Sequence, residues 1–240
     1  MTQKEKAKLV PVSREPALLT ERDADKSPEI TGLIGPNGAG KTTVFNLLTK
    51  VYQPTHGTIL LNGKDIHDLN TAQVNRAGIA RTFQNIRLFG ELSVEENITV
   101  AMDTQMHYTM PEGIFRLPRF WKEERIVHER AMELLSIFHM EDLAKAKASS
   151  LPYGAQRRLE ILRALATNPS LLLLDEPAAG MNPSETAELM ENIRSIRDTF
   201  KIAVLLIEHD MNFVMGICEG IGVLNFGRII AKGTPDEIRN

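Results

Sequence analysis

A glycine-rich segment near the start of the chain has the residue types that bind phosphate groups. Residues Gly35-Pro36-Asn37-Gly38-Ala39-Gly40-Lys41-Thr42 fit the pattern G-x-x-x-x-G-K-[ST]. In this pattern backbone amides surround phosphate oxygens, the lysine reaches the outer phosphates, and the last hydroxyl binds Mg²⁺. The alternative is an ordinary glycine-rich turn. An apolar stretch before the segment and an amphipathic one after it favour a strand, a phosphate-binding loop and a helix.

Two acidic residues follow a run of four leucines. Leu171–Leu174 predicts a buried strand, and Asp175 and Glu176 stand at its carboxyl end. In a parallel sheet this end meets the nucleotide, so Asp175 is expected to hold Mg²⁺ through water. Glu176 is expected to polarise the water that attacks the γ-phosphate. Adjacent acids are also common in plain surface turns, but the phosphate-binding loop earlier in the chain favours the catalytic interpretation.

Two further polar residues follow apolar runs. The Gln84 carboxamide can ligate Mg²⁺ and orient water, and the His209 imidazole can hydrogen-bond a γ-phosphate. Taken alone, such a glutamine is more often an ordinary exposed residue, and a histidine after a strand is more often structural. A role in nucleotide chemistry is predicted for Gln84 and His209 only because the phosphate-binding loop and the acid pair are also present.

These residues need a sheet and helices to position them. Short apolar runs alternate with amphipathic stretches, which predicts an α/β domain with a mainly parallel sheet. A tight turn is predicted at Asn62-Gly63. The expected strands are Ile30–Ile34, Thr58–Leu61, Leu171–Leu174, Ile202–Ile207 and a closing hairpin of Val223–Asn225 with Arg228–Ala231. The expected helices are Lys41–Thr49, Glu185–Phe200 and much of Val94–Ala166.

Composition limits the classes of protein that the chain can represent. Of 240 residues, 42% are apolar and 25% are charged, which is typical of globular domains. The formal net charge of −3 argues against nucleic acid as a partner. No apolar run approaches the roughly 20 residues of a membrane-spanning helix, and the N-terminus lacks the apolar segment of a secretory signal. With a single cysteine, Cys218, these features predict a soluble, cytoplasmic protein.

Residues 1–28 differ from the remainder of the chain. They are polar, contain three prolines and hold no aromatic residue, so we expect a weakly structured segment. The α/β pattern runs over residues 29–240. A helix-rich stretch of about residues 90–168 interrupts it, which predicts a helical lobe inserted between Gln84 and the acid pair.

Taken together, these motifs resemble the ATP-binding-cassette (ABC) family over about residues 29–240. The order is the phosphate-binding loop (Walker A), Gln84, a signature segment, the acid pair (Walker B), a D-loop and His209. Within the family the chain is similar to the LivG-like ATP-binding subunits of bacterial branched-chain amino acid importers. The segments that carry this likeness are 81–89 (RTFQNIRLF), 151–161 (LPYGAQRRLEI), 175–183 (DEPAAGMNP), 207–211 (IEHDM) and 233–238 (GTPDEI).

The resemblance implies a P-loop NTPase fold, with a RecA-like core, and Mg²⁺-dependent ATP hydrolysis coupled to transport. It implies that Glu176 is the catalytic base, that His209 senses the γ-phosphate, and that Gln84 also acts in catalysis. Asn182 falls in the D-loop. The nucleotide contacts that it implies are Gly35, Pro36, Asn37, Gly38, Ala39, Gly40, Lys41, Thr42, Thr43, Gln84, Asp175 and Gly154, with Thr42, Gln84 and Asp175 as Mg²⁺ ligands.

The resemblance also implies partners. ABC domains form head-to-tail dimers, so a second ABC ATPase subunit is expected, and each ATP lies between the Walker A of one chain and the signature of the other. Two transmembrane permease subunits are expected and, indirectly, a periplasmic or extracellular substrate-binding protein. The implied location is peripheral, at the cytoplasmic face of the bacterial inner (plasma) membrane. The segment after Gln84, through about Thr104, would form part of the groove that receives a permease helix.

Two features depart from the family pattern. The usual signature Leu-Ser-Gly-Gly-Gln is replaced by Leu151-Pro152-Tyr153-Gly154-Ala155. One hypothesis is that the ATP site using this signature is the weaker of two in a heterodimer; the other is that the variant is normal and competent in its subfamily. In addition, no aromatic residue precedes Phe45 to stack on adenine, which predicts weaker and less base-selective nucleotide binding.

Three alternatives to a branched-chain amino acid importer stay open. Related importers of urea or short amides have similar cassettes, because permeases and binding proteins choose the substrate. A non-transport ABC ATPase is disfavoured, since the chain has no long heptad repeats and no second cassette. A hydrolysis-defective ATP-binding subunit is favoured by the altered signature and disfavoured by Glu176 and His209. The residues do not distinguish a homodimer from a heterodimer.

Overall fold

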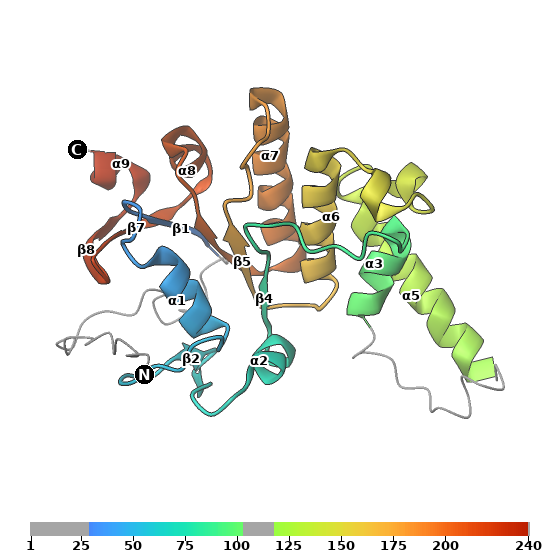
Figure 1. Ribbon diagram of the computed structural model, residues 1–240, viewed down its shortest axis with the longest axis horizontal. Helices are drawn as coiled ribbons and strands as arrows, with labels where there is room; N and C mark the ends of the chain where they lie inside the picture. Colours follow the sequence, from blue (N-terminus) through green and yellow to red (C-terminus); the bar gives the residue numbers. More distant parts are fainter. Residues whose placement is uncertain (1–28, 103–117, 240) are drawn as a thin grey trace, which may run out of the picture.

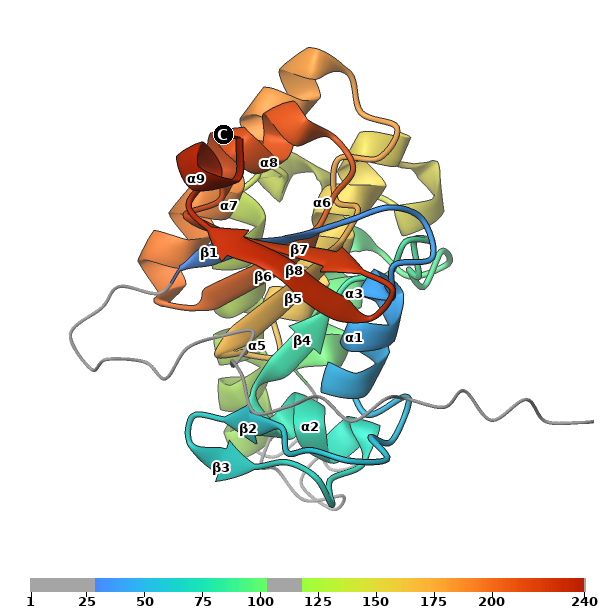
Figure 2. The ribbon, with the colours of Figure 1, turned by 90° about the vertical axis from the view of Figure 1, so that its left-hand side faces the viewer.

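The computed structural model describes residues 29–102 and 118–239. Its main sheet has six strands in the order β4-β5-β6-β1-β7-β8 (Figures 1 and 2). Neighbouring strands are parallel, except that β7 and β8 are antiparallel. The strands are β1 (Ile30–Ile34), β4 (Ile79–Arg81), β5 (Leu171–Asp175), β6 (Ala203–Ile207), β7 (Gly220–Asn225) and β8 (Arg228–Gly233). The predicted α/β class with a mainly parallel sheet is therefore confirmed.

The central strands are buried on both faces. In β5, Leu172 and Leu174 belong to the apolar cluster on one face of the sheet, whereas Leu171 and Leu173 belong to the cluster on the other. This alternation follows from the two-residue repeat of a strand. All four leucines are at most 4% exposed, so the predicted double burial is confirmed.

Helices cover both faces of the sheet (Figure 2). The first two helices and a small hairpin lie on one face: α1 (Lys41–Leu48), α2 (Thr71–Ala77), β2 (Leu60–Leu61) and β3 (Lys64–Asp65). Three later helices lie on the other: α6 (Tyr153–Leu165), α7 (Pro183–Phe200) and α8 (Met211–Ile217). The last helix, α9 (Pro235–Arg239), contacts β8.

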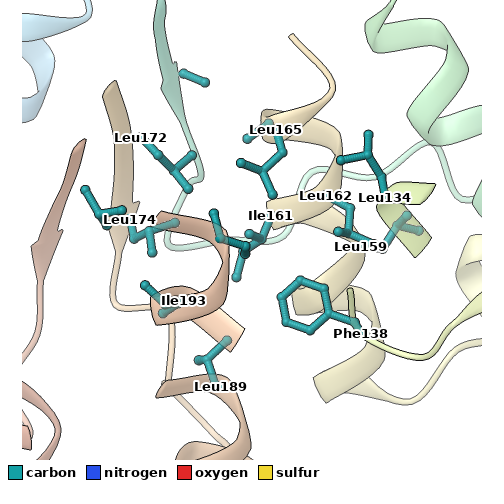
Figure 3. Packing of buried hydrophobic residues seen from close by; sticks show 14 of the residues in the cluster. Leu134, Phe138, Leu159, Ile161, Leu162, Leu165, Leu172, Leu174, Leu189 and Ile193 are labelled. Atoms are coloured by element: carbon teal, nitrogen blue, oxygen red, sulfur yellow. The ribbon is translucent and has the colours of Figure 1, made fainter. Parts of the chain in front are cut away.

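Helix α6 joins a second helical layer to the sheet. The helices α3 (Val94–Ala101) and α5 (Pro118–Ser136) pack on α6 and lie away from the strands (Figure 1). Two short turns, η2 (Glu141–Leu143) and η3 (Ala148–Ser150), lead from α5 to α6. Figure 3 shows Ile161 of α6 between Leu174 of β5 and Phe138. One continuous apolar cluster thus fixes the helical layer against the strand that carries the acid pair.

Polar residues at helix starts fix where several helices begin. The Asn182 side chain accepts a hydrogen bond from Glu185 N at 3.0 Å, and the Glu185 carboxylate accepts one from Asn182 N at 2.9 Å. This capping box, followed by Pro183, starts α7. Ser93 and Glu96 form the same arrangement at the start of α3. The D-loop residue Asn182 is therefore held in place by the helix that it caps.

The predicted elements are present with small differences in their ends, whereas α2, β4, α8 and α9 were not predicted. Strand β2 begins at Leu60 rather than Thr58, because only Leu60 and Leu61 pair across the Asn62-Gly63 turn. The closing hairpin is longer than predicted, and helices occupy much of the described part of residues 94–166. The predicted weakly structured segment 1–28 lies outside the described residues. None of the helices in residues 29–102 and 118–239 combines the length and the apolar character needed to span a bilayer.

Candidate functional site

The phosphate-binding loop lies between β1 and α1, as its sequence pattern predicts. The Lys41 side chain folds back over the loop, and its Nζ donates to Gly35 O at 2.7 Å and to Pro36 O at 3.1 Å. Burial lowers the pKa of Lys41, and the negative charges of Glu176 and Asp175 oppose that shift. The Lys41 ammonium therefore lies close enough to both acids for their charges to act on it, and its hydrogen bonds hold the loop in a compact shape.

The closing hairpin β7–β8 supports this loop from one side. Gly227 N, at the hairpin turn, donates to Ala39 O at 2.8 Å. Gly35 lies so close to β7 that a Cβ atom there would be 2.1 Å from Leu224 O. The Gly35 φ of +152° also disfavours any residue with a side chain. Close backbone approach, and not only flexibility, is thus the reason for glycine at position 35.

A cavity of about 320 Å³ opens beside the loop. Parallel pairing brings the carboxyl ends of β1, β5 and β6 to one edge of the sheet, where the cavity lies. Its lining consists of Asn37, Gly38, Ala39, Gly40, Lys41, Thr42, Thr43, Gln84, Glu176, Ile207 and His209. The structure therefore brings together most of the site residues predicted from the sequence.

Four predicted residues lie elsewhere. Gly35 and Pro36 form the back of the loop, where their carbonyls accept from Lys41. Asp175, which is 5% exposed, ends β5 beneath the surface. Gly154 lies in the first turn of α6, where it packs against the Glu185 side chain. None of these four is among the described residues that line the cavity.

Glu176 is the centre of a hydrogen-bonded group at the cavity. Gln84 Nε2 donates to Glu176 Oε2 at 3.0 Å, and His209 Nε2 lies 2.6 Å from Glu176 Oε1. The Glu176 backbone has a φ of +50°, which is uncommon for a residue with a side chain. Its N–H donates to Ile207 O at 2.9 Å, at the end of the neighbouring strand. The three polar side chains thus converge from the ends of three strands.

Asp175 forms a buried ion pair that the sequence analysis missed. Arg81, at the end of β4, places Nη2 2.8 Å from Asp175 Oδ2, and both side chains are 7% exposed. Arg81 Nη1 also donates to Asn46 Oδ1 at 2.7 Å. The guanidinium lies 5.3 Å from the centre of the Phe45 ring and 5.2 Å from that of Phe83. Arg81 is therefore held on several sides and neutralises the buried carboxylate.

Arg157 and Glu160 form a second buried ion pair, on α6. Their side chains are 0% and 2% exposed, and Arg157 Nη1 lies 2.8 Å from Glu160 Oε2. Arg157 also donates to the carbonyls of Phe83, Asp175 and Glu176. Burial raises the pKa of the Glu160 carboxyl group, and the charge of Arg157 opposes that shift. These contacts connect α6 to two of the three loops that carry the predicted catalytic residues, those of Gln84 and Glu176.

A signal for these missed residues is present in the sequence. Arg157 and Glu160 are three positions apart on a helix whose other buried positions include Leu159, Ile161 and Leu162, so two charges fall among buried apolar residues. Glu208, before His209, is likewise 6% exposed. Its carboxylate accepts from Ala178 N at 2.9 Å and from His209 N at 3.0 Å. Charged residues are almost never fully buried unless they are paired. A charged residue at a position where the apolar repeat of a helix or strand predicts burial therefore indicates a paired group that positions its neighbours.

Tyr153 of the signature segment lies close to the predicted D-loop, the stretch between Glu176 and Asn182. A Cβ atom on Gly180, four residues after Glu176, would lie 3.2 Å from Tyr153 Cε1. Tyr153 is about half exposed and begins α6. The Tyr153 ring thus packs on the D-loop backbone, at a place where the usual signature has a glycine.

A second cavity is lined by residues of β4 and of the helices α2, α3 and α6. It measures about 250 Å³ and is lined by Asn75, Ala80, Arg81, Phe89, Val100, Ala101, Glu160, Arg163, Ala164 and Thr167. Phe89, Val100 and Ala101 belong to the segment after Gln84. Phe89 and Val100 are large apolar side chains, and each is about half exposed. This groove therefore offers apolar contacts beside two buried ion pairs.

Known proteins share this sequence and fold. The ABC transporter family matches residues 26–179. LivG of Escherichia coli (strain K12), a high-affinity branched-chain amino acid transport ATP-binding protein, is 49% identical over 212 residues, which are 88% of this chain and 83% of LivG. BraF of Pseudomonas aeruginosa, which has the same description, is 47% identical with the same coverage.

A solved structure agrees with the sequence comparison. The ADP conformation of an ATP-binding cassette of an ABC transporter has a TM-score of 0.75 and 32% identity, covering 89% of this chain and 84% of that chain. Three findings agree: the family match, the identity to LivG and BraF, and the shared fold. The chain therefore belongs to the ABC transporter family, as a nucleotide-binding ATPase.

Proposed function

We propose that this chain hydrolyses ATP to power the import of branched-chain amino acids (Leu, Ile and Val) through an ABC transporter. The observation that carries the proposal is the meeting of Lys41, Gln84, Glu176 and His209 at one cavity, in a chain 49% identical to LivG. The cavity supplies the cation, the base and the polar side chains that phosphoryl transfer to water requires. The identity to LivG supports the substrate class.

Nucleotide binding begins at the phosphate-binding loop. Lys41 Nζ donates to Gly35 O and Pro36 O, and the third N–H of the ammonium group can donate to the phosphates of ATP. The N-terminus of α1 points its free amides toward the same place. Positive charge and backbone donors are therefore in position before the ligand arrives.

The donor atoms beside the loop fit Mg²⁺. The Thr42 hydroxyl and the Gln84 amide oxygen are hard oxygen donors that line the nucleotide cavity. The buried Asp175 carboxylate does not line the cavity, and its Oδ2 accepts from Arg81 Nη2. We assign Thr42 and Gln84 as ligands and Asp175 as a partner through water. Bound Mg²⁺ would neutralise phosphate charge during hydrolysis.

Glu176 is the proposed base. Its carboxylate reaches into the cavity and takes the proton of the water that attacks the γ-phosphorus, while the bond to the bridging oxygen breaks and ADP leaves. Gln84 and His209 each contact one oxygen of this carboxylate, which limits its rotation. His209, half exposed beside it, would then donate to a γ-phosphate oxygen.

The second half of the ATP site comes from a partner. Gly154 and the N-terminus of α6 are not part of the nucleotide cavity of the same chain, so we propose a head-to-tail dimer in which they meet the ATP of the second ATPase subunit. The groove of about 250 Å³ beside α3 and α6 is the proposed seat for a helix of one of the two permease subunits. We therefore propose a peripheral location at the cytoplasmic face of the bacterial inner membrane, beneath permeases that a substrate-binding protein serves.

Uptake by cells tests the proposal. A strain lacking this gene is complemented with the wild-type chain, with Lys41→Ala or with Glu176→Gln, and uptake of radiolabelled leucine and urea is measured. We expect leucine uptake with the wild-type chain alone, because Lys41→Ala loses ATP binding and Glu176→Gln loses turnover. Urea uptake without leucine uptake would identify a related importer instead.

A second measurement addresses a hydrolysis-defective subunit. The chain is purified with the membrane subunits that accompany it, and phosphate release is followed with Mg²⁺ or with EDTA. We expect Mg²⁺-dependent release that falls on the order of 100-fold or more in Glu176→Gln. Equal release by the wild-type and Glu176→Gln complexes would show that this site does not hydrolyse ATP.

A further inference from the structure

We propose that Arg157 is a positioning residue, which holds Glu176 in its reactive conformation and fixes the loop of Gln84 to it. Arg157 lies one turn into α6, three residues after Gly154, and is fully buried. It does not line the nucleotide cavity, so it acts through its neighbours and not on ATP. The inference rests on the proposed function only in taking Glu176 as the base.

The first set of contacts fixes the Glu176 backbone. Arg157 Nη2 donates to Asp175 O and, at 2.8 Å, to Glu176 O. On the other side of the same residue, Glu176 N donates to Ile207 O at 2.9 Å. A left-handed backbone in a residue with a side chain persists only where its surroundings hold it. Arg157 fixes the Glu176 carbonyl, and Ile207 at the end of β6 fixes the Glu176 N–H.

The second set of contacts reaches the loop of Gln84. Arg157 Nη1 donates to Phe83 O, and the paired Glu160 accepts from Phe83 N at 3.3 Å. Both polar backbone atoms of Phe83 are thus bound by one ion pair. Gln84 follows directly, and its Nε2 donates to Glu176 Oε2 at 3.0 Å. One guanidinium therefore sets the distance between the two loops whose side chains meet at the cavity.

The shape of arginine suits this task. A guanidinium is flat and presents donors in a fixed fork, so its two Nη atoms can hold two loops at a set separation. Lysine offers a single flexible ammonium and cannot bridge the same acceptors. Buried ion pairs add little net stability compared with apolar residues of similar volume, so stability alone does not explain Arg157 and Glu160.

The test removes both charges together. Arg157→Met alone leaves Glu160 buried without a counterion, which can prevent folding. The double variant Arg157→Met/Glu160→Leu keeps the volume apolar and neutral, yet lacks the donors to Phe83 O and Glu176 O. The control is Arg158→Met, on the next residue of α6, where Arg158 pairs at 3.0 Å with the partly exposed Glu188. Folding of each variant is checked by circular dichroism and thermal unfolding.

Two readouts separate positioning from structure. Binding of a fluorescent ATP analogue to the purified chain should change less than about threefold, whereas phosphate release by the assembled complex should fall on the order of 100-fold, as for small misplacements of catalytic groups. Arg158→Met should leave both unchanged. A folded double variant that keeps more than half of the wild-type turnover, or that loses ATP binding in parallel with turnover, overturns the proposal.

A background that lacks both positioned side chains completes the test. If Arg157 acts through Glu176 and Gln84, adding Arg157→Met/Glu160→Leu to Gln84→Ala/Glu176→Gln should lower the residual turnover by less than about twofold, because residues that act as a unit are not additive. A further large loss would instead indicate an independent role and overturn the proposal. The two proposals fail in different ways. Wild-type turnover by Glu176→Gln alone would contradict the proposed function, whereas retained turnover by the folded variant Arg157→Met/Glu160→Leu would contradict only the role of Arg157.

Discussion

His209 Nε2 lies 2.6 Å from Glu176 Oε1, although the two residues are 33 positions apart in the chain. The contact follows from the sheet: β5 and β6 are neighbours, and Asp175 pairs with Ile207 at their carboxyl ends. Each residue then follows its strand by one or two positions. The pairing of two strands therefore places the proposed base, Glu176, beside His209 at the edge where the phosphates are expected.

Replacing His209 tests this contact. We expect His209→Ala to lower phosphate release by the assembled complex on the order of 100-fold, because one side chain that positions Glu176 and donates to developing charge is lost. Binding of a fluorescent ATP analogue should be retained. The control is His128→Ala, since His128 Nδ1 lies at the same distance, 2.6 Å, from Glu95 on the helical layer. Similar losses in both variants would contradict a specific role for His209.

Removing Arg81 is expected to destabilise the protein. Arg81→Met leaves Asp175 buried without its counterion, which costs about 3–5 kcal/mol. For a domain of this size the melting temperature should fall by roughly 6–20 °C in thermal unfolding. Lys147→Met is the control, because Lys147 and Glu91 are also 2.8 Å apart but are both largely exposed. Equal melting temperatures for Arg81→Met and Lys147→Met would show that burial does not strengthen the Arg81 pair.

Two glycine substitutions separate backbone strain from collision. Gly227→Ala places a Cβ in open space at a φ of +75°, so we expect a loss of about 1–2 kcal/mol. Gly35→Ala places a Cβ 2.1 Å from Leu224 O, and the expected loss is roughly 4 kcal/mol or more. Denaturant unfolding measures both. A Gly35→Ala variant as stable as Gly227→Ala would mean that the loop can move away from β7.

Stability should fall at high pH because of Cys218. Burial raises the pKa of its thiol from 9.0 to about 12, with a smaller effect from the charge of Glu219. The folded state then binds more protons than the unfolded state, so this contribution is complete below pH 9 and is lost between pH 9 and 12. The loss amounts to roughly 4 kcal/mol. The difference in unfolding free energy between the wild-type chain and Cys218→Ala, measured across that range, isolates the thiol from other groups; a constant difference would contradict the prediction.

Local patterns were enough to predict much of the fold. Four consecutive leucines at 171–174 predict a strand buried on both faces, and the structure confirms both the strand and its burial. The amphipathic run before Phe200 predicts the crossover helix α7. These predictions hold because periodicity and burial are local properties that each element expresses in its own residues. The ends of β2 were less certain, since pairing across a hairpin depends on both of its strands.

The candidate site, too, was predicted only in part from local patterns. The phosphate-binding loop and the residues Gln84, Glu176 and His209 were predicted from motifs, and the structure places them at one cavity. Arg81 and Arg157 were not predicted as partners of the acid pair. Each lies at least 18 positions from the acidic residue or carbonyl that it contacts near Asp175. The role of such a side chain depends on a partner that is distant in the sequence. The only local sign of that role is a charged residue among apolar neighbours.

The sequence by itself determined the chemistry that is available: a glycine-rich loop with a lysine, two acids after an apolar strand, a glutamine and a histidine. Only the tertiary structure decided which of these groups meet. It placed Glu176 between Gln84 and His209, paired Asp175 with Arg81 and assigned Arg157 to three backbone carbonyls. The physical reason is that motifs specify residue types over short stretches, whereas contacts between strand ends depend on the order and register of the whole sheet.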